Sequence, residues 1–461
     1  MGGNARGGKQ MNLYERAFRH ALFPAYEAAR GRHTLQHLRE YEANQWLPAE
    51  QIAELQWRKL TALVAYCWEQ VPYYRQRWQA IGFEPGDLRS MEDYARLPVL
   101  TKADIRTHFD QLKSRSLQHR LLYKVTGGST GEPLRFGYTR ESLDRRTAVM
   151  WRGYGWAGAR IGQRALFLWG GPIGERTRIA QLKERLYHAA FQRRILDSFR
   201  MREDNMAAYA DAIANWRPEV IVAYVDPIVR LSEWLLAQGR TIPGVAAVLG
   251  AAEALHDFQR PVIEAAFPGA RTCNTYGCRE FMLIACEAED RDGLLVSADH
   301  LVVELVNASR TDDGNETGEL AITDLHNLGM PFLRYVNGDI ASRKNPWHAT
   351  GRRGLPRLSR IDGRRLDAIR TTDGRVLPGE FFPAMLMNVA GVRRFQVVQD
   401  SLERFTLKLV PGPDFDAEQE AYLRREISKV LGDDASLDLQ LVDDIPLTAS
   451  GKFRVTVSRL P

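Results

Sequence analysis

The chain has 461 residues, of which 44% are hydrophobic and 26% charged. This length predicts more than one domain, each with a sizeable core. Lys and Arg outnumber Asp and Glu by 63 to 57, which indicates either an ordinary basic surface or attraction to an acidic partner or polyanionic substrate. The sequence has neither a dense Lys/Arg block with interleaved aromatic residues nor a zinc-finger spacing, so we expect no nucleic-acid partner.

The sequence carries no signal for a membrane span or for secretion. It lacks a run of 18 apolar residues, so we expect no membrane span. Residues 1–10 are rich in glycine and predict a disordered tail, not a signal peptide. Arg6 also departs from the myristoylation pattern. Four cysteines without a secretory signal predict reduced thiols in a cytoplasmic protein.

The first 340 residues predict helices followed by an alternation of strands and helices. Residues 11–80 read as helical, with a break at Pro72. Between 140 and 340, short apolar strands alternate with helices, which is typical of a doubly wound sheet with helices on both faces. We expect strands at 164–169, 220–225, 246–249, 301–305 and 318–323, and helices at 206–215, 227–238 and 255–266.

The composition changes near residue 360. Downstream we expect strands at 394–399, 405–410 and 436–442 and an amphipathic helix at 416–431. This is the pattern of a small α+β domain that could fold by itself. We therefore predict a large α/β domain over 1–362, including the tail, and a small domain over 363–461.

A glycine-rich segment, Thr-Gly-Gly-Ser-Thr-Gly-Glu-Pro at 126–133, follows a β-prone stretch. Glycines and hydroxyl side chains allow successive backbone N–H groups to form a nest for oxyanions. The Gly-Lys-Ser/Thr ending of a Walker A loop is absent. An ordinary surface turn is the alternative interpretation.

Five further short motifs follow in order. They are Gly-Ala-Ala-Glu at 250–253, Asn-Thr-Tyr-Gly-Cys-Arg-Glu at 274–280, Arg-Tyr-Val-Asn-Gly-Asp at 334–339, Arg-Ile-Asp-Gly-Arg at 360–364, and Pro-Leu-Thr-Ala-Ser-Gly-Lys-Phe-Arg at 446–454. With the glycine-rich segment, this set resembles the adenylate-forming (ANL) superfamily. Within that superfamily it is most similar to the phenylacetate–CoA ligase family and its capsule-biosynthesis and coenzyme F390 synthetase-like relatives. The likeness runs from about residue 64 to Lys452.

The resemblance implies a large adenylation domain, a small mobile C-terminal domain and a two-step reaction. Such enzymes join a carboxylic acid to the α-phosphate of ATP, release pyrophosphate, and pass the acyl group to a thiol. The thiol would belong to coenzyme A or to the phosphopantetheine of an acidic acyl carrier protein. An amine acceptor and a non-catalytic adenylate-binding protein are the alternatives. The oligomeric state stays open, with a dimer plausible.

The resemblance also implies the residues of the site. The ATP contacts would be Ser129, Thr130 and Gly131 at the β- and γ-phosphates, Tyr276 with Gly277 at adenine, and Asp339 and Arg364 at the ribose. Glu253 would also bind the nucleotide. Glu280 would hold Mg²⁺ with help from Thr130, since oxygen ligands suit this cation. Lys452 would neutralise charge on the α-phosphoryl group.

The sequence departs from the family pattern at three places. Glu132 stands where a loop lysine is common, Leu366 where a polar hinge residue is common, and Arg279 where Thr or Ser usually precedes Glu280. Arg279 would meet a polar or anionic substrate group or pair with Glu280. The segment 347–356 lacks the cysteines of the zinc site found in some relatives, so we expect no zinc.

The pocket for the acid is expected to be apolar and flat, which suits an aromatic acid of the benzoate or phenylacetate type. Its candidate residues are Trp169, Tyr224, Asp226, Arg279, Phe281 and Met282. Asp226 would bond a ring hydroxyl. For each apolar member, a place in the core is the alternative interpretation.

Overall fold

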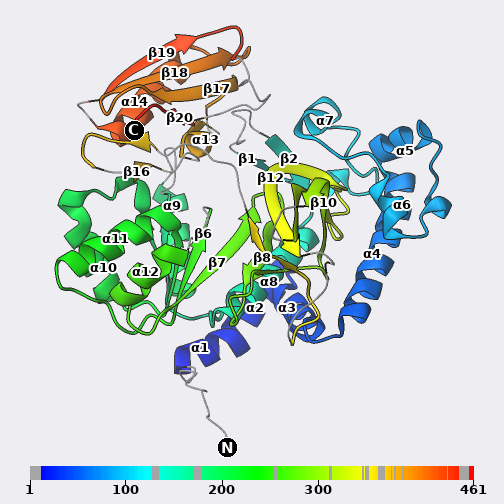
Figure 1. Cartoon of the computed structure of the whole chain (residues 1–461), viewed down its shortest axis with the longest axis horizontal. Coiled ribbons are helices and arrows are strands. Elements are labelled where there is room, and N and C mark those ends of the chain that lie inside the picture. Colours follow the sequence, from blue (N-terminus) through cyan, green and yellow to red (C-terminus); the bar gives the residue numbers. More distant parts are fainter. Residues whose placement is uncertain are drawn as a thin grey trace, which may run out of the picture.

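The computed structural model describes residues 12–126, 134–170, 178–252, 255, 257–310, 314–344, 347, 352–361, 369–374, 376–377, 381–386, 389–432, 435–445 and 456–460. Figure 1 shows a large N-terminal part and a smaller C-terminal part that lies over one side of it. This arrangement confirms the predicted fold class of a large α/β domain followed by a small α+β domain.

Helices make up the N-terminal segment, as predicted. They are α1 (Leu13–Ala17), α2 (Phe23–Arg30), α3 (Thr34–Asn44), α4 (Ala49–Gln70), α5 (Pro72–Gln79), α6 (Met91–Ala95) and α7 (Lys102–Thr107). Helix α4 buries Leu60, Leu63, Val64 and Cys67, which lie on one face at helical spacing. It ends at Val71 because a residue before proline disfavours the helical region, while Pro72 suits the first turn of α5.

A sheet of eight strands forms the centre of the large domain, in the order β13-β9-β8-β7-β6-β5-β3-β4. Its parallel strands are β3 (Ala165–Trp169), β4 (Arg193–Asp197), β5 (Val220–Tyr224), β6 (Ala247–Ala251) and β7 (Arg271–Cys278). Strands β5 and β6 are buried at every residue, which explains why they read as continuous apolar runs. These strands confirm the prediction of a wound parallel sheet.

Within the described residues, five helices alternate with the strands of this sheet along the chain. They are α8 (Arg140–Trp156), α9 (Arg178–Ala190), α10 (Met206–Trp216), α11 (Val225–Ala237) and α12 (Arg260–Ala266). Helix α11 begins two residues before the expected position. Helix α12 begins later than the expected residue 255, because residues 257–259 form a 3₁₀ turn and Pro261 favours a helix start at this point.

The strands expected at 301–305 and 318–323 do not join the parallel sheet, which corrects the sequence interpretation. They belong to an antiparallel sheet of β10 (Leu301–Arg310), β11 (Asn315–Asp324), β12 (Tyr335–Lys344) and β14 (Arg360–Ile361). The link from β10 to β11 is only four residues long, too short for a parallel crossover. Antiparallel strands also extend the main sheet, namely β8 (Met282–Glu287), β9 (Leu294–Val296) and β13 (Arg357–Leu358).

A hairpin of β1 (Leu122–Thr126) and β2 (Leu134–Tyr138) flanks the glycine-rich segment. Residues 127–133 lie outside the described residues.

The C-terminal part contains its own four-stranded sheet, in the order β19-β18-β17-β20. Its elements are β17 (Val392–Gln399), β18 (Arg404–Pro411), α14 (Ala417–Leu431), β19 (Ser436–Leu441) and β20 (Thr456–Ser458), preceded by β15 (Ile369–Arg370), β16 (Val376–Leu377) and α13 (Phe381–Leu386). The predicted elements are confirmed, and β20 is an addition. The boundary at 362/363 falls outside the described residues and stays a prediction.

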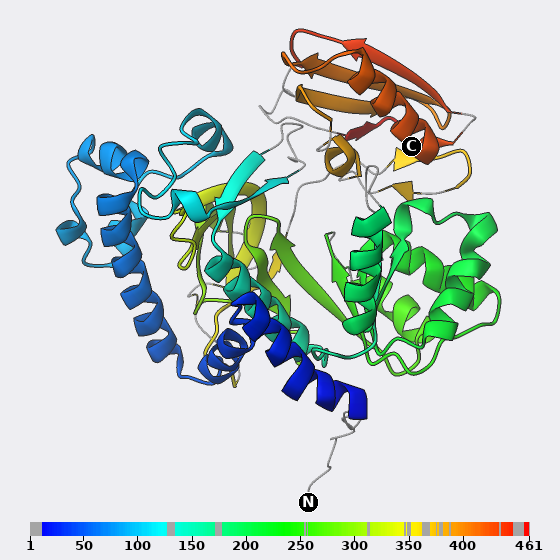
Figure 2. The same ribbon diagram turned by 180° about the vertical axis from the view of Figure 1, so that it is seen from behind.

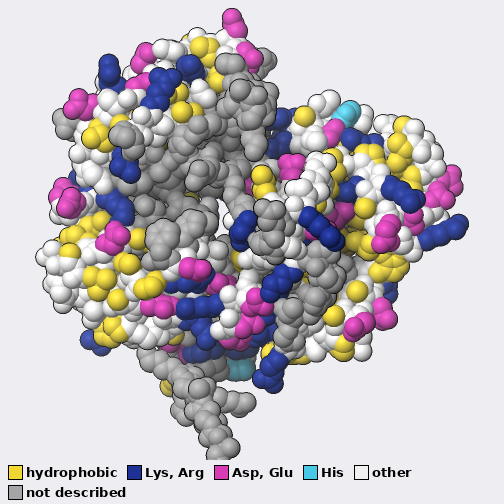
Figure 3. All heavy atoms as spheres, viewed as in Figure 1, with side chains coloured by type: hydrophobic (Ala, Val, Ile, Leu, Met, Phe, Trp, Pro, Cys, Tyr) yellow, Lys and Arg dark blue, Asp and Glu magenta, His cyan; other side chains and the backbone are white. Residues whose placement is uncertain are grey.

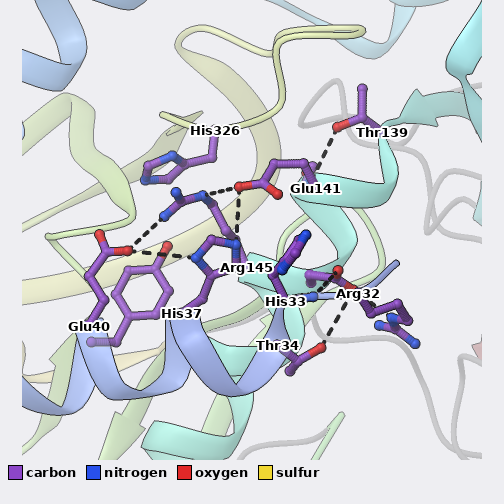
Figure 4. A network of polar contacts seen from close by, with 12 residues as sticks. Arg32, His33, Thr34, His37, Glu40, Thr139, Glu141, Arg145 and His326 are labelled. Atoms are coloured by element: carbon purple, nitrogen blue, oxygen red, sulfur yellow. Dashed lines mark hydrogen bonds and ion pairs between the residues drawn. The ribbon is translucent and has the colours of Figure 1, made fainter. Parts of the chain in front are cut away.

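A network of polar side chains fixes α3 against α8 (Figure 4). Arg145 on α8 donates to Glu40 at 3.2 Å and to Glu141 at 2.9 Å. His37 on α3 lies between the two carboxylates, 3.1 Å from Glu141 and 3.6 Å from Glu40. The close contact with His37, followed by the charges of Arg145 and Lys59, lowers the pKa of Glu40 to about 2.

Candidate active site

The carboxyl ends of β3, β5, β6 and β7 meet at one edge of the main sheet. Trp169 ends β3 and Tyr224 ends β5. Segment 276–280 lies at the end of β7. Ligands of open α/β sheets bind beyond this edge, and the described site residues of the sequence analysis gather there.

Tyr276, Asn337 and Asp339 form a hydrogen-bonded group that joins the end of β7 to β12. The Tyr276 hydroxyl donates to Asp339 Oδ2 at 2.7 Å. Asn337 Nδ2 donates to the same carboxylate oxygen at 2.7 Å and to the Tyr276 hydroxyl at 2.8 Å. Burial and then the Asp339 charge raise the pKa of Tyr276 well above its usual value, so the hydroxyl stays protonated and donates.

Glu280 lies next to this group, in the turn between β7 and β8. Its side chain is buried, and Oε1 accepts a hydrogen bond from the Tyr335 hydroxyl at 3.2 Å. Burial and then the negative charge of Glu280 raise the pKa of the neighbouring Cys278 thiol. A buried carboxylate with one phenolic donor is suited to a cation that arrives with a substrate.

Two members of this site, Asn337 and Tyr335, were missed by the sequence analysis. They alternate with Asp339 along β12, so all three side chains reach the same face of the strand. This spacing of two was visible in the motif at 334–339. What the sequence did not show was that this face of β12 meets the end of β7.

Gly277 has a structural reason to be glycine. A Cβ at this position would meet the Met282 carbonyl oxygen at 1.9 Å. The β7–β8 register shifts between Tyr276 and Gly277, which is where a β-bulge brings two backbones close together. The close backbone contact thus shapes the turn that carries Tyr276 and Glu280.

Arg279 links the site to strand β1, which precedes the glycine-rich segment. Its Nη1 donates to the Val125 carbonyl at 3.0 Å. The side chain is exposed. This contact differs from both partners considered for Arg279 in the sequence analysis.

The candidate residues of the acid pocket separate into two groups. Trp169 and Tyr224 stack with ring centroids 4.4 Å apart, and Tyr224 belongs to a hydrophobic cluster that includes Phe382 and Met385 of the C-terminal part. Phe281 is fully buried and packs near Phe332 and Tyr335, which agrees with the core interpretation, and its place in the pocket stays a prediction.

Met282 is partly buried with a φ of 68°. The backbone of Asp226 lies in the first turn of α11, and its side chain is outside the description. Several predicted contacts cannot be placed because they lie outside the described residues. They are Ser129, Thr130, Gly131, Glu132, Glu253, Arg364, Leu366 and Lys452.

A cavity of about 700 Å³ lies away from the Tyr276 group. It is lined by Arg334, Val336 and Gly338, which alternate with Tyr335, Asn337 and Asp339 along the chain. Its wall also carries Glu304, which Arg334 holds at 3.2 Å. We therefore do not identify this cavity with the candidate active site.

The four cysteines are free thiols, and Cys67, Cys273 and Cys286 are buried. Burial raises the pKa of each of these thiols, for Cys273 to about 12. Among the described residues, no group of three or more His, Cys, Asp and Glu side chains could hold a metal ion. The absence of zinc stays a prediction.

Two surface properties bear on possible partners. On the face shown in Figure 3, acidic and basic side chains are interspersed and do not gather by sign. Within the described parts of the chain, none of the helices combines the length and apolarity needed to cross a bilayer.

Comparison with known proteins gives two informative relatives in sequence. A phenylacetate–coenzyme A ligase of Thermus thermophilus is 27% identical over 389 residues, which cover 80% of this chain and 83% of that protein. A phenylacetate–coenzyme A ligase of Aromatoleum evansii is 24% identical over 438 residues, covering 89% and 95%. Residues 369–459 match the family of the CapK C-terminal domain.

The fold is similar to that of a crystallised 2-hydroxyisobutyryl-CoA ligase in complex with 2-HIB-AMP and CoA. The TM-score is 0.60 at 20% identity, with 90% of this chain and 92% of that chain covered. These findings confirm the resemblance predicted from the motifs.

Proposed function

We propose that this chain is an AMP-forming acid–thiol ligase, because it is similar in sequence to phenylacetate–coenzyme A ligases and in fold to a 2-hydroxyisobutyryl-CoA ligase. It activates a carboxylic acid with ATP, releases pyrophosphate, and transfers the acyl group from acyl-AMP to a thiol. The observation that carries this proposal is the group Tyr276–Asn337–Asp339 beside Glu280 at the carboxyl edge of the sheet.

The geometry of this group suits a nucleotide. Asp339 is held in place by two donors at 2.7 Å, so its carboxylate is pre-oriented to accept hydrogen bonds from ribose hydroxyls. The Tyr276 hydroxyl fixes the ring beside Asp339, and we propose that adenine binds against this tyrosine. Tyr335, which bonds Glu280, lies four residues from Asp339 on β12, so the two Cα atoms are at most about 13 Å apart. A triphosphate can bridge this separation.

The residues also fit Mg²⁺. This cation is usually bound by one or two carboxylates together with substrate phosphates. Glu280 supplies one buried carboxylate and needs no preassembled cluster around it. Glu280 would hold Mg²⁺, with Thr130 as a second oxygen ligand, and the bound ion would supply positive charge for the phosphates.

Lys452 is proposed to approach the α-phosphate from the C-terminal part, and Arg364 to bond the ribose. Ser129, Thr130 and Gly131 are proposed to bind the β- and γ-phosphates. These roles rest on the motifs.

The proposed acid is aromatic. Trp169 and Tyr224 form a stacked pair at the ends of β3 and β5, and aromatic side chains prefer offset or edge contacts with another ring. The relatives are named for phenylacetate, which agrees with this surface. The proposed acceptor is coenzyme A, as in the names of the relatives, and an acyl carrier protein is the alternative thiol.

The direct test is acid-dependent release of pyrophosphate from ATP and Mg²⁺. Phenylacetate, benzoate, hydroxybenzoates and 2-hydroxyisobutyrate would be offered separately, and thioester would then be measured with coenzyme A and with a phosphopantetheinylated carrier protein. We expect release with an aromatic acid and thioester with coenzyme A. Release with 2-hydroxyisobutyrate alone would overturn the aromatic assignment. Nucleotide binding without release for any acid would indicate a non-catalytic protein.

A further inference from the structure

Helix α9 presents its apolar side to solvent. Ile179, Leu182 and Leu186 are 68%, 57% and 62% exposed. Their spacing of three and four residues places them on one face of the helix, and we call them the α9 stripe. Helix α14 has the ordinary arrangement, because its stripe of Leu423, Ile427 and Leu431 is buried.

The polar side of α9 faces the protein. Glu184 and His188 are only partly exposed and form an ion pair at 3.7 Å. At about 100° per residue, these two side chains lie opposite the stripe. The orientation of α9 therefore places this ion pair on its less exposed side and leaves its apolar side chains exposed.

Basic side chains flank the stripe. Lys183 projects to one side of it and Arg185 to the other, by the same helical geometry. Both are exposed, and neither makes an ion pair or hydrogen bond with any described residue. The flanks therefore carry two uncompensated positive charges beside an aliphatic surface.

The surface continues onto neighbouring elements. Ile195 on β4, the last strand of the main sheet, is 41% exposed. Leu13 on α1 is 85% exposed, and the Tyr14 hydroxyl donates to the carbonyl of Ala190 at the end of α9. Figure 2 shows α9 and the N-terminal helices on the near face of the molecule. Exposed apolar side chains that gather on neighbouring elements mark interaction sites.

We propose that this face binds the surface of an anionic membrane. An aliphatic stripe flanked by Lys and Arg is the composition of helices that lie in the interface of a bilayer. Lipid headgroups would supply the anions that Lys183 and Arg185 lack, and acyl chains would cover the stripe. A second copy of the chain fits less well, because a symmetric contact would bring these unpaired cations together.

The test is sedimentation of the full chain with vesicles of phosphatidylcholine and with vesicles that also contain phosphatidylglycerol. We expect binding to the anionic vesicles that weakens as salt is added, since surface charges are screened. Leu182→Ser with Leu186→Ser should lower the partition coefficient at least tenfold. Lys183→Gln should lower it about fivefold, the equivalent of about 1 kcal/mol per charge.

Leu402→Ser is the matched control. Leu402 is 46% exposed and lies in the turn between β17 and β18, so its loss should leave binding unchanged. All the substituted side chains are exposed, and unaltered thermal unfolding would show that each variant folds. Failure to sediment, or equal sedimentation of the double-leucine variant, would overturn the proposal. A fall in molar mass of that variant without vesicles would instead assign the face to a second copy. Pyrophosphate release, measured in parallel, reports separately on the proposed ligase activity.

Discussion

Replacing Asp339 with alanine separates the structural role of this carboxylate from its proposed role at the ribose. The carboxylate accepts two hydrogen bonds at 2.7 Å, from Tyr276 and Asn337. Both donors are less than 10% exposed, so water replaces the lost acceptor poorly. A hydrogen bond to a charged group contributes about 1.5–3 kcal/mol. Because Asn337 can still donate to the Tyr276 hydroxyl at 2.8 Å, we expect the free energy of unfolding to fall by about 2–4 kcal/mol.

The proposed ribose contact adds a second, independent effect. Its loss should weaken ATP binding by roughly 10–150-fold, the equivalent of about 1.5–3 kcal/mol. Tyr276→Phe is the matched control, because it removes the hydroxyl but keeps the ring and Asp339. This variant should lose about 1–2 kcal/mol of stability and bind ATP nearly as tightly as the wild type.

Urea unfolding and calorimetric titration with ATP measure the two effects. If Asp339→Ala lowers stability while the dissociation constant of ATP stays the same, the carboxylate serves only to hold Tyr276. If Tyr276→Phe weakens ATP as much as Asp339→Ala does, the two contributions are not separable and the reasoning above is wrong.

Three further predictions concern other parts of the chain. Lys452→Ala should abolish ATP–pyrophosphate exchange while thioester formation from a synthetic acyl-adenylate survives; equal loss of both would reject the proposed role. Gly277→Ala should destabilise the fold by about 2 kcal/mol or more, because the added Cβ meets the Met282 carbonyl at 1.9 Å, and an unchanged unfolding midpoint would contradict this. The lowered pKa of Glu40 means that its ionised form adds stability above pH 4.5, which is lost as the pH falls toward about 2. Glu40→Gln should therefore be less stable than the wild type at pH 7, and urea unfolding from pH 7 to pH 3 should show that difference narrowing.

The alternation of strands and helices was readable because local patterns determine it. Buried strands such as β5 are continuous apolar runs, and the amphipathic helix α14 begins at the N-cap Asp416 as its sequence indicates. The separate sheet of β10–β12 was missed because apolar alternation does not tell which sheet a strand joins. The strands expected at 301–305 and 318–323 left a long gap, and only the structure shows that both strands extend until four residues link them.

The contacts of the site depend on longer distances. Tyr276 and Asp339 are 63 residues apart in sequence, and their hydrogen bond forms only because two sheets close on one another. The motifs indicated that both residues matter, and Asn337 was visible in the second motif, but its contact with Tyr276 was not. Phe281 could not be assigned either, since an aromatic side chain after a strand suits a pocket wall and a core equally well.

The burial of the cysteines has a practical consequence for assays. Thiol reagents react with thiolates, and a thiol with a raised pKa inside the protein offers almost none. Cys67, Cys273 and Cys286 are all of this kind, and the pKa of the partly exposed Cys278 is also raised. A chromogenic disulfide added at neutral pH should therefore report the free thiol of coenzyme A well before it modifies the folded chain. The coenzyme A that remains can therefore be measured in samples withdrawn from a reaction of the native protein, with no cysteine replaced.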